Sequence, residues 1–194
     1  MKRLLIFFVM FLITKSMENN VTVCYRSDLH DAVEYDDLDK AENCIVVKGI
    51  NPNWLYVCNL PLSSAARRGN VPMCRLLLRN GADINGQDST ESTAVYTAAF
   101  FSQFEVVRYL CCRGADANHV KKGSTPLHAA ILSGATDRKG LFKTVSTLLL
   151  CGARRDLRDS ASRTPAESAA FSGFEDITML LQARDPLGDG RVQK

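Results

Sequence analysis

Apolar and polar residues recur along this chain with a helical period, in short blocks separated by small residues. In the block 106–111 the apolar side chains are spaced as on one side of a helix, and the block stops before Gly114, which is typical of a helix end. Similar apolar blocks stop before turns at residues 81–83 and 152–153. The pattern predicts an all-α chain built from short helices.

A second apolar segment, rich in alanine, precedes each of these blocks, and its copies form a repeat. One interval between successive copies, from Leu127 to Ala166, is longer than the others. Its extra residues fall at about 135–140, and we expect them to bulge between the two helices of their unit. Intervals of this length are typical of stacked architectures, in which a unit buries its apolar side only against a neighbour. The copies begin at Leu62, Val95, Leu127 and Ala166, at intervals of 33, 32 and 39 residues, with a fainter copy 33 residues earlier at Leu29.

Capping residues predict how each unit folds. Thr125 and Thr164 each precede a proline, an order that favours an N-cap followed by the first helical position. Gly69 and Gly173 follow alanine-rich segments, where glycine ends a helix in the left-handed conformation. Each unit is therefore expected to contain two short antiparallel helices.

The segment 125–130, Thr-Pro-Leu-His-Ala-Ala, together with the Gly-Ala-Asp turns that begin residues 81–85 and 114–118, resembles the ankyrin repeat. The resemblance covers residues 27–183. It implies an all-α ankyrin-repeat solenoid of about five stacked helix-turn-helix units. The first unit, residues 27–59, lacks both the proline and the glycine turn, so the expected count is four to five.

The two ends of the chain differ from the repeat region. Residues 1–16 carry two basic residues before ten apolar ones, the layout of a signal peptide. A helix of that length spans about 15 Å, too short to cross a bilayer. The segment fits a cleaved secretion signal, a hydrophobic helix that caps the core, or non-native sequence upstream of a start at Met17. Residues 17–26 are expected to be a linker, and residues 184–194 a disordered tail.

Composition and charge place the chain among ordinary folded proteins. Apolar residues make up 46% of the sequence and charged residues 23%, which suits a single unit with a buried core. The net charge of +3 is too small to make nucleic acid or an anionic membrane the default partner. We expect a monomer without a membrane span that does not bind nucleic acid.

The seven cysteines form no Cys-x-x-Cys pair and no regular framework, so neither a zinc site nor a disulfide scaffold is expected. Cys74 and Cys111 occupy apolar positions of the repeat and are expected to be buried, with Cys112 more exposed. Thiols in a helical core suit a reducing compartment and favour a cytoplasmic location. The chain would be secreted if residues 1–16 are a signal peptide, so localisation stays open.

Catalytic motifs are absent from the sequence. It has no glycine-rich phosphate loop, no His-Glu-x-x-His and no Gly-x-Ser-x-Gly, so we expect no enzyme, no catalytic residue, no metal and no cofactor. The ankyrin resemblance implies that His30 and His128 form structural hydrogen bonds to a neighbouring turn. His119 lies in a turn beside Asn118, and we expect it to be an exposed contact residue.

The ankyrin resemblance also implies a partner-binding surface, the concave side formed by inner helices and projecting turns. Residues 27–49 hold seven acidic and two basic side chains, a net charge of −5, whereas residues 67–143 hold eleven basic and six acidic ones, a net charge of +5. A charge gradient along the groove is therefore expected. The candidate contact residues are Arg67, Arg68, Phe100, Phe101, Leu132 and Phe171 on the inner helices, and His119, Lys121 and Lys122 in one turn.

Two functions fit these features. The first is a non-enzymatic module that binds an unidentified protein through the concave face and the turns. The second is a secreted or host-directed ankyrin protein exported by its N-terminal segment. The alternative to a binding role for the aromatic residues is that they pack on neighbouring repeats.

Overall fold

A computed structural model of the chain describes residues 28–133 and 137–183. The hydrophobic N-terminal segment 1–16, the linker 17–26 and the disordered tail 184–194 expected from the sequence lie outside the described residues. Within the described ranges, no helix combines the length and apolar character needed to cross a membrane.

The described residues form five consecutive helix pairs, in agreement with the predicted all-α solenoid of about five units. Their only β-type pairings are isolated bridges in two turns. The pairs are residues 28–34 with α2 (Leu38–Glu42) and the π-helix η1 (Asn43–Val47), α3 (Pro61–Arg68) with α4 (Val71–Arg79), α5 (Ala94–Phe100) with α6 (Phe104–Cys112), α7 (Pro126–Leu132) with α8 (Arg138–Leu150), and α9 (Pro165–Phe171) with α10 (Glu175–Gln182).

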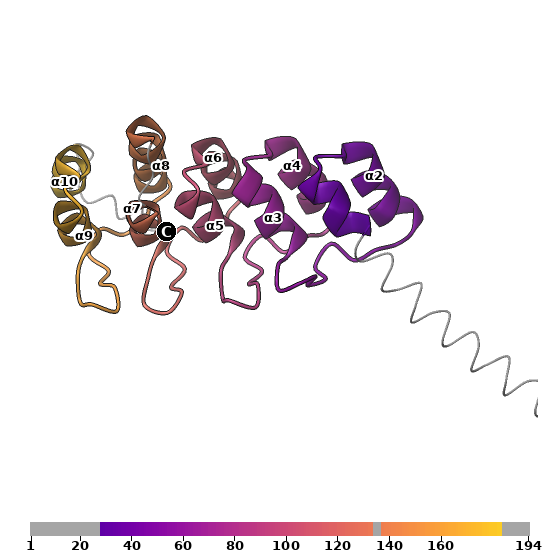
Figure 1. Cartoon of the computed structure of the whole chain (residues 1–194), viewed down its shortest axis with the longest axis horizontal. Helices are drawn as coiled ribbons and strands as arrows, with labels where there is room; N and C mark the ends of the chain where they lie inside the picture. Colours follow the sequence, from indigo (N-terminus) through magenta and orange to yellow (C-terminus); the bar gives the residue numbers. More distant parts are fainter. Residues whose placement is uncertain (1–27, 134–136, 184–194) are drawn as a thin grey trace, which may run out of the picture.

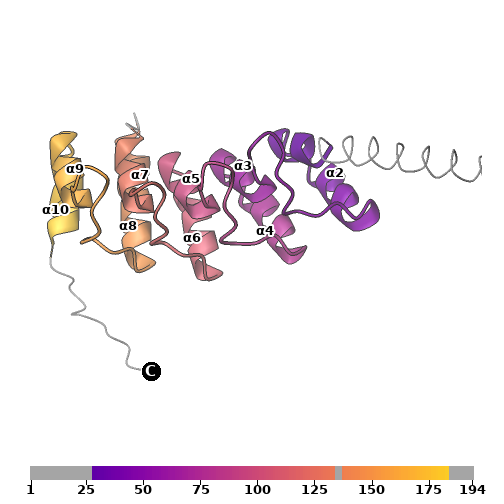
Figure 2. The ribbon, with the colours of Figure 1, turned by 90° about the horizontal axis from the view of Figure 1, so that it is seen from below.

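The helix pairs stack side by side into an elongated molecule (Figure 1). Helices α3, α5, α7 and α9 form an inner row, and α4, α6, α8 and α10 form an outer row behind it. The long turns between units, here called the fingers, all project on the same side (Figures 1 and 2). Each unit therefore packs on its sequence neighbours, as a solenoid requires.

Capping follows the sequence prediction. The side chains of Thr125 and Thr164 accept hydrogen bonds from backbone N–H groups in the first turns of α7 and α9, and both form capping boxes. The side chain of Thr93 also caps α5, by accepting a hydrogen bond from the backbone N–H of Tyr96, although Ala94 stands in place of proline and no capping box forms. Gly69 ends α3 at a φ of 75°, a left-handed conformation that glycine adopts without strain.

The first unit is complete despite its weak sequence signature. Asp36 adopts a φ of 59° and takes the place of the glycine turn, which aspartate tolerates better than most residues. The side chain of Asp37 then caps α2 by accepting a hydrogen bond from the backbone N–H of Lys40, at 2.9 Å. Two aspartates thus build the turn that sequence inspection did not find.

Of the insertion at 135–140, which the sequence predicts to bulge, residues 135–136 lie outside the described residues and residues 138–140 do not bulge. Residues 138–140 belong to α8, whose N-terminus is capped by the side chain of Asp137. Helix α8 has 13 residues, compared with 9 in α6. The prediction was wrong for these residues because a local cap allows the outer helix to begin one turn earlier.

Asparagine side chains join successive units at the base of the fingers. Each carbonyl oxygen accepts a hydrogen bond from a backbone N–H about one repeat later, which satisfies a donor in the next turn. The pairs are Asn53 with Asp83 at 2.7 Å, Asn85 with Asp116 at 2.9 Å, and Asn118 with Arg154 at 2.8 Å.

His128 forms the hydrogen bond to a neighbouring turn that the resemblance implies. Its Nε2 lies 3.0 Å from the backbone oxygen of Arg163 and its Nδ1 lies 2.8 Å from Oγ1 of Thr125. A neutral ring satisfies both, with Nε2–H donating and Nδ1 accepting. His30 differs, because its Nδ1 is buried without a partner and its ring lies 4.9 Å from that of Tyr56.

We expect stability to fall as the pH is lowered below the ordinary histidine value. Burial lowers the pKa of His128 from the usual 6.5, so below that pH the unfolded chain binds a proton that the folded chain resists. Denaturant titrations at about pH 7.5 and about pH 5.5 would measure the loss. His128→Gln should show a smaller difference between the two pH values, and an equal difference would contradict this role for His128.

The six cysteines in the described ranges are free thiols. Cys74 is buried and Cys112 exposed, as predicted, while Cys111 is only partly buried. We expect folding to be independent of disulfides, so a reducing agent should leave the melting temperature of the native protein unchanged within error. A fall of many degrees would show that disulfides form and would strengthen the export hypothesis.

Candidate functional site

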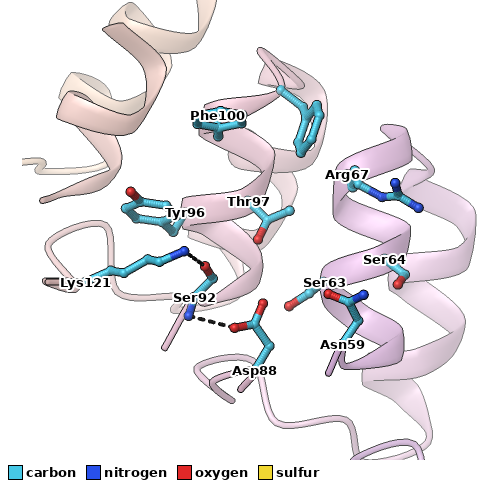
Figure 3. A pocket seen from close by; sticks show the side chains of 11 residues that line it. Asn59, Ser63, Ser64, Arg67, Asp88, Ser92, Tyr96, Thr97, Phe100 and Lys121 are labelled. Atoms are coloured by element: carbon cyan, nitrogen blue, oxygen red, sulfur yellow. Dashed lines mark hydrogen bonds between the residues drawn. The ribbon is translucent and has the colours of Figure 1, made fainter. Parts of the chain in front are cut away.

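Two adjoining pockets form a groove on the inner-row side of the first three units. The first, here called the α3/α5 pocket, has a volume of about 250 Å³ (Figure 3), and the second, the first-unit pocket, has a volume of about 530 Å³. They share Asn59 and Arg67. The α3/α5 pocket is lined by Asn59, Ser63, Ser64, Arg67, Asp88, Ser92, Tyr96, Thr97, Phe100, Phe101 and Lys121. The first-unit pocket is lined by His30, Asp31, Glu34, Tyr35, Val57, Asn59, Arg67 and Arg68.

The floor of the α3/α5 pocket is polar. Asp88 is only 9% exposed, and its Oδ1 accepts hydrogen bonds from the backbone N–H groups of Thr90 at 2.8 Å and Ser92 at 3.0 Å. Its second carboxylate oxygen points toward the pocket (Figure 3). Ser63 lies opposite, buried, with no hydrogen-bond partner for its Oγ. The floor therefore offers hydrogen-bonding atoms that a ligand could satisfy.

Lys121 reaches into this pocket from the next finger. Its Nζ lies 2.6 Å from Oγ of Ser92 and 3.0 Å from Oγ1 of Thr90. The same ammonium group lies 5.0 Å from the centre of the Tyr96 ring, within the range of a cation–π contact. Lys121 thus holds two fingers together as well as lining the pocket.

The other two turn candidates are placed differently. His119 is half-buried, with Nε2 only 2.9 Å from the backbone oxygen of Glu91 in the preceding finger. The prediction that it is exposed was wrong, because adjacent fingers lie close enough for its ring to bridge them. Lys122 is exposed and adopts a φ of 46°. Neither residue lines the groove.

Phe100 and Phe101 form an aromatic rim on the α3/α5 pocket. Their ring centres lie 5.2 Å apart in an edge-to-face arrangement, which is favourable for aromatic pairs. They remain 39% and 46% exposed, so neither is absorbed into the core. Leu132 and Phe171 are 51% and 81% exposed but lie farther along the inner row and line neither pocket of the groove.

Arg67 and Arg68 are paired within the chain. The guanidinium of Arg67 donates to both carboxylate oxygens of Glu34, at 2.7 and 2.8 Å. Arg68 lies 3.4 Å from Asp36 and 3.5 Å from Glu34. The acidic first unit and the basic second unit therefore neutralise each other where they meet. Such exposed ion pairs contribute at most about 1 kcal/mol to stability. A charged group of a partner can therefore replace one member of a pair at low cost.

The side chains that line the groove are aromatic, charged and hydroxyl-bearing. Among the residues the structure describes, no cluster of histidine, cysteine or acidic side chains is arranged to hold a metal ion. No cysteine lines either pocket, and in the outer row burial raises the pKa of Cys74 to about 12 and also raises that of Cys111, which makes both thiols poor nucleophiles. What the groove presents is aromatic surface beside hydrogen-bonding groups, as protein interfaces do.

Sequence analysis missed the polar floor of the α3/α5 pocket. It identified Arg67, Phe100, Phe101 and Lys121, which the structure brings together with residues of the finger between α4 and α5. Asp88 could have been found by aligning the fingers, because it stands at the same repeat position as Asp159. The other lining residues outside the candidate set are Asn59, Ser63, Ser64, Ser92, Tyr96 and Thr97.

Comparison with known proteins gives consistent matches to ankyrin repeats. A model of three ankyrin repeats matches residues 29–121 and 62–138, and a single-repeat model matches residues 122–160. The chain is 35% identical over 122 residues to ankyrin repeat and SOCS box protein 11 of Danio rerio, covering 63% of this chain and 39% of that protein. It is 33% identical over 123 residues to cyclin-dependent kinase 4 inhibitor B of Homo sapiens, covering 62% of this chain and 84% of that protein.

A third match shows how widely the same region recurs in larger proteins. The chain is 35% identical over 106 residues to the E3 ubiquitin-protein ligase Ufd4 of Drosophila melanogaster, covering 53% of this chain but 4% of that protein. The matched region thus spans well under two thirds of the Danio and Drosophila relatives.

Proposed function

Because the chain belongs to the ankyrin repeat family, we propose that it is a non-enzymatic module that binds a partner protein through the groove between its first and third units. The observation that carries the proposal is the aromatic rim of Phe100 and Phe101 beside the polar floor of the α3/α5 pocket. Partly exposed aromatic side chains in a central pocket are the usual anchors of protein interfaces.

The relatives support a binding role. The human relative is named as an inhibitor of a protein kinase, a protein that acts on another protein, and the match covers most of its length. The Drosophila relative is named as a ligase, but the match covers a small fraction of that enzyme. The part shared with this chain is the repeat stack, whose open groove suits recognition of a protein segment.

An exported ankyrin protein is the second candidate. It depends on residues 1–16, which lie outside the described residues, and on the signal-like pattern of that segment. Sequencing the N-terminus of the native protein decides between the two. A mature end near Ser16 or Met17 outside the cell would establish export, and a start near Met17 without export would remove it.

Site-specific photo-crosslinking tests the proposed groove. A photoreactive phenylalanine replaces Phe101 on the rim or, as a matched control, Phe142 on α8 of the outer row, which is 39% exposed. Crosslinking from position 101, followed by mass spectrometry, should yield a specific adduct with one protein, and position 142 should not. Equal yields from both positions, or adducts only from position 142, would contradict binding through the groove.

A further inference from the structure

Two fingers of this chain have the same construction at equivalent repeat positions, 71 residues apart. Oδ1 of Asp159 accepts hydrogen bonds from the backbone N–H groups of Ala161 and Arg163, both at 2.9 Å. Oδ1 of Asp88 accepts from Thr90 and Ser92, at 2.8 and 3.0 Å. The fourth residue of each turn is left-handed, with φ of 61° at Ser162 and 65° at Glu91. The two carboxylates therefore occupy corresponding places.

The second oxygen distinguishes the two carboxylates. The guanidinium of Arg163 donates to Oδ2 of Asp159 at 3.3 Å. The same guanidinium lies 5.0 Å from the centre of the Phe171 ring. In the earlier finger, Ser92 stands at the position of Arg163 and Phe100 at that of Phe171. No described side chain pairs with Oδ2 of Asp88. The earlier finger thus has the carboxylate and the ring of an arginine site without the arginine.

The surroundings leave room for that missing group. Oγ of Ser63 is buried without a hydrogen-bond partner and faces Asp88 across the pocket of about 250 Å³ (Figure 3). Neither nearby cation bonds to Oδ2 of Asp88, because Arg67 is paired with Glu34 and Lys121 donates to the hydroxyl groups of Thr90 and Ser92. One carboxylate oxygen and one hydroxyl remain available on the pocket floor. Both accept hydrogen bonds, which suits a cationic donor.

We propose that the α3/α5 pocket binds an arginine side chain of the partner protein. Its guanidinium donates to Oδ2 of Asp88 and to Oγ of Ser63 and lies over the ring of Phe100, as Arg163 lies over Phe171 beside Asp159. Arginine is favoured over lysine because its planar group presents several donors and stacks on aromatic rings. The inference rests on the proposed function, since it names the group that the groove recognises.

The test uses a capped arginine, N-acetyl-arginine N-methylamide, titrated into the full chain while backbone amide signals are followed by NMR. We expect saturable shifts centred on Asp88, Ser92 and Phe100, with capped norleucine giving none and capped lysine binding several-fold more weakly. Equal binding of capped lysine would overturn the choice of arginine. Absence of shifts at the pocket would overturn the site itself.

Two variants locate the binding group. Asp88→Asn keeps an oxygen for the turn but replaces Oδ2 with an amide, and it should weaken binding of capped arginine by about tenfold or more. Asp116→Asn, an exposed finger aspartate whose Oδ1 accepts from Asn118 at 2.8 Å, is the matched control and should bind like the wild type. Wild-type affinity in Asp88→Asn would overturn the proposal.

Ser92→Arg keeps the proposal testable if Asp88→Asn fails to fold. This variant places an arginine at the position of Arg163, and we expect it to occupy the pocket and abolish binding of capped arginine while the melting temperature is retained. Undiminished binding by folded Ser92→Arg would overturn the proposal. If this variant still binds the crosslinked partner while replacement of Phe100 and Phe101 abolishes that binding, the arginine inference fails and the proposed function stands. A partner that crosslinks away from the groove removes the proposed function whatever the capped arginine does.

Discussion

Replacing Leu148 with alanine is expected to lower the free energy of unfolding by about 2–5 kcal/mol. Leu148 is fully buried in α8, within the continuous core formed by the two helix rows. The substitution removes apolar contacts and leaves a cavity that the neighbouring units can close only in part. Urea denaturation followed by circular dichroism measures the change, with the slope of the transition checked for constancy.

Leu150→Ala provides the control in the same helix. Leu150 is 86% exposed, so its removal should change the free energy of unfolding by less than about 0.5 kcal/mol. The two substitutions delete the same atoms, and burial is the main difference between them. Equal losses would show that α8 does not pack in the core as described.

Replacing Phe100 and Phe101 together with alanine is expected to weaken partner binding by a factor of hundreds or more. Aromatic anchors at the centre of an interface contribute about 2 kcal/mol or more each, and a combined loss of about 4 kcal/mol corresponds to that factor. Both rings keep a substantial exposed area at the rim of the α3/α5 pocket. Calorimetric titration with the partner identified by crosslinking measures the loss.

This comparison needs a folded variant and an aromatic control. The helical content and melting temperature of the double variant are measured first, because the alternative is that the two rings stabilise the stack. Phe142→Ala on the outer row removes a ring of similar exposure and should leave binding unchanged. Unfolding of the double variant, or full binding by its folded form, would redirect attention to the fingers.

The helix pairs could be predicted from the sequence because their causes are local. Thr125 and Thr164 cap the helices that they precede, and Gly69 adopts the left-handed turn that its position required. Periodic apolar residues then fix which side of each helix is buried. A search for glycine turns failed in the first unit, because Asp36 adopts the left-handed conformation there in place of glycine.

The groove could be predicted only in part, because neighbouring units form it together. Phe100 and Arg67 follow from their positions on the inner helices, and both line the α3/α5 pocket. The contacts of Lys121 with Ser92 and Tyr96 depend on how close two fingers lie. The pairing of Arg67 with Glu34 likewise joins side chains 33 residues apart. Such contacts depend on the geometry of the stack, which no single repeat specifies.

The extended α8 shows where the length of a repeat can vary without changing the residues that line the groove. Its additional turn is at the N-terminal end of an outer-row helix, which rises above its neighbours on the side away from the fingers (Figure 1). That turn contacts the last unit through the ion pair between Arg138 and Asp176, at 3.1 Å, and none of its residues lines either pocket of the groove. A lineage can therefore gain or lose residues at that end of a unit while the side chains that line the two pockets stay the same.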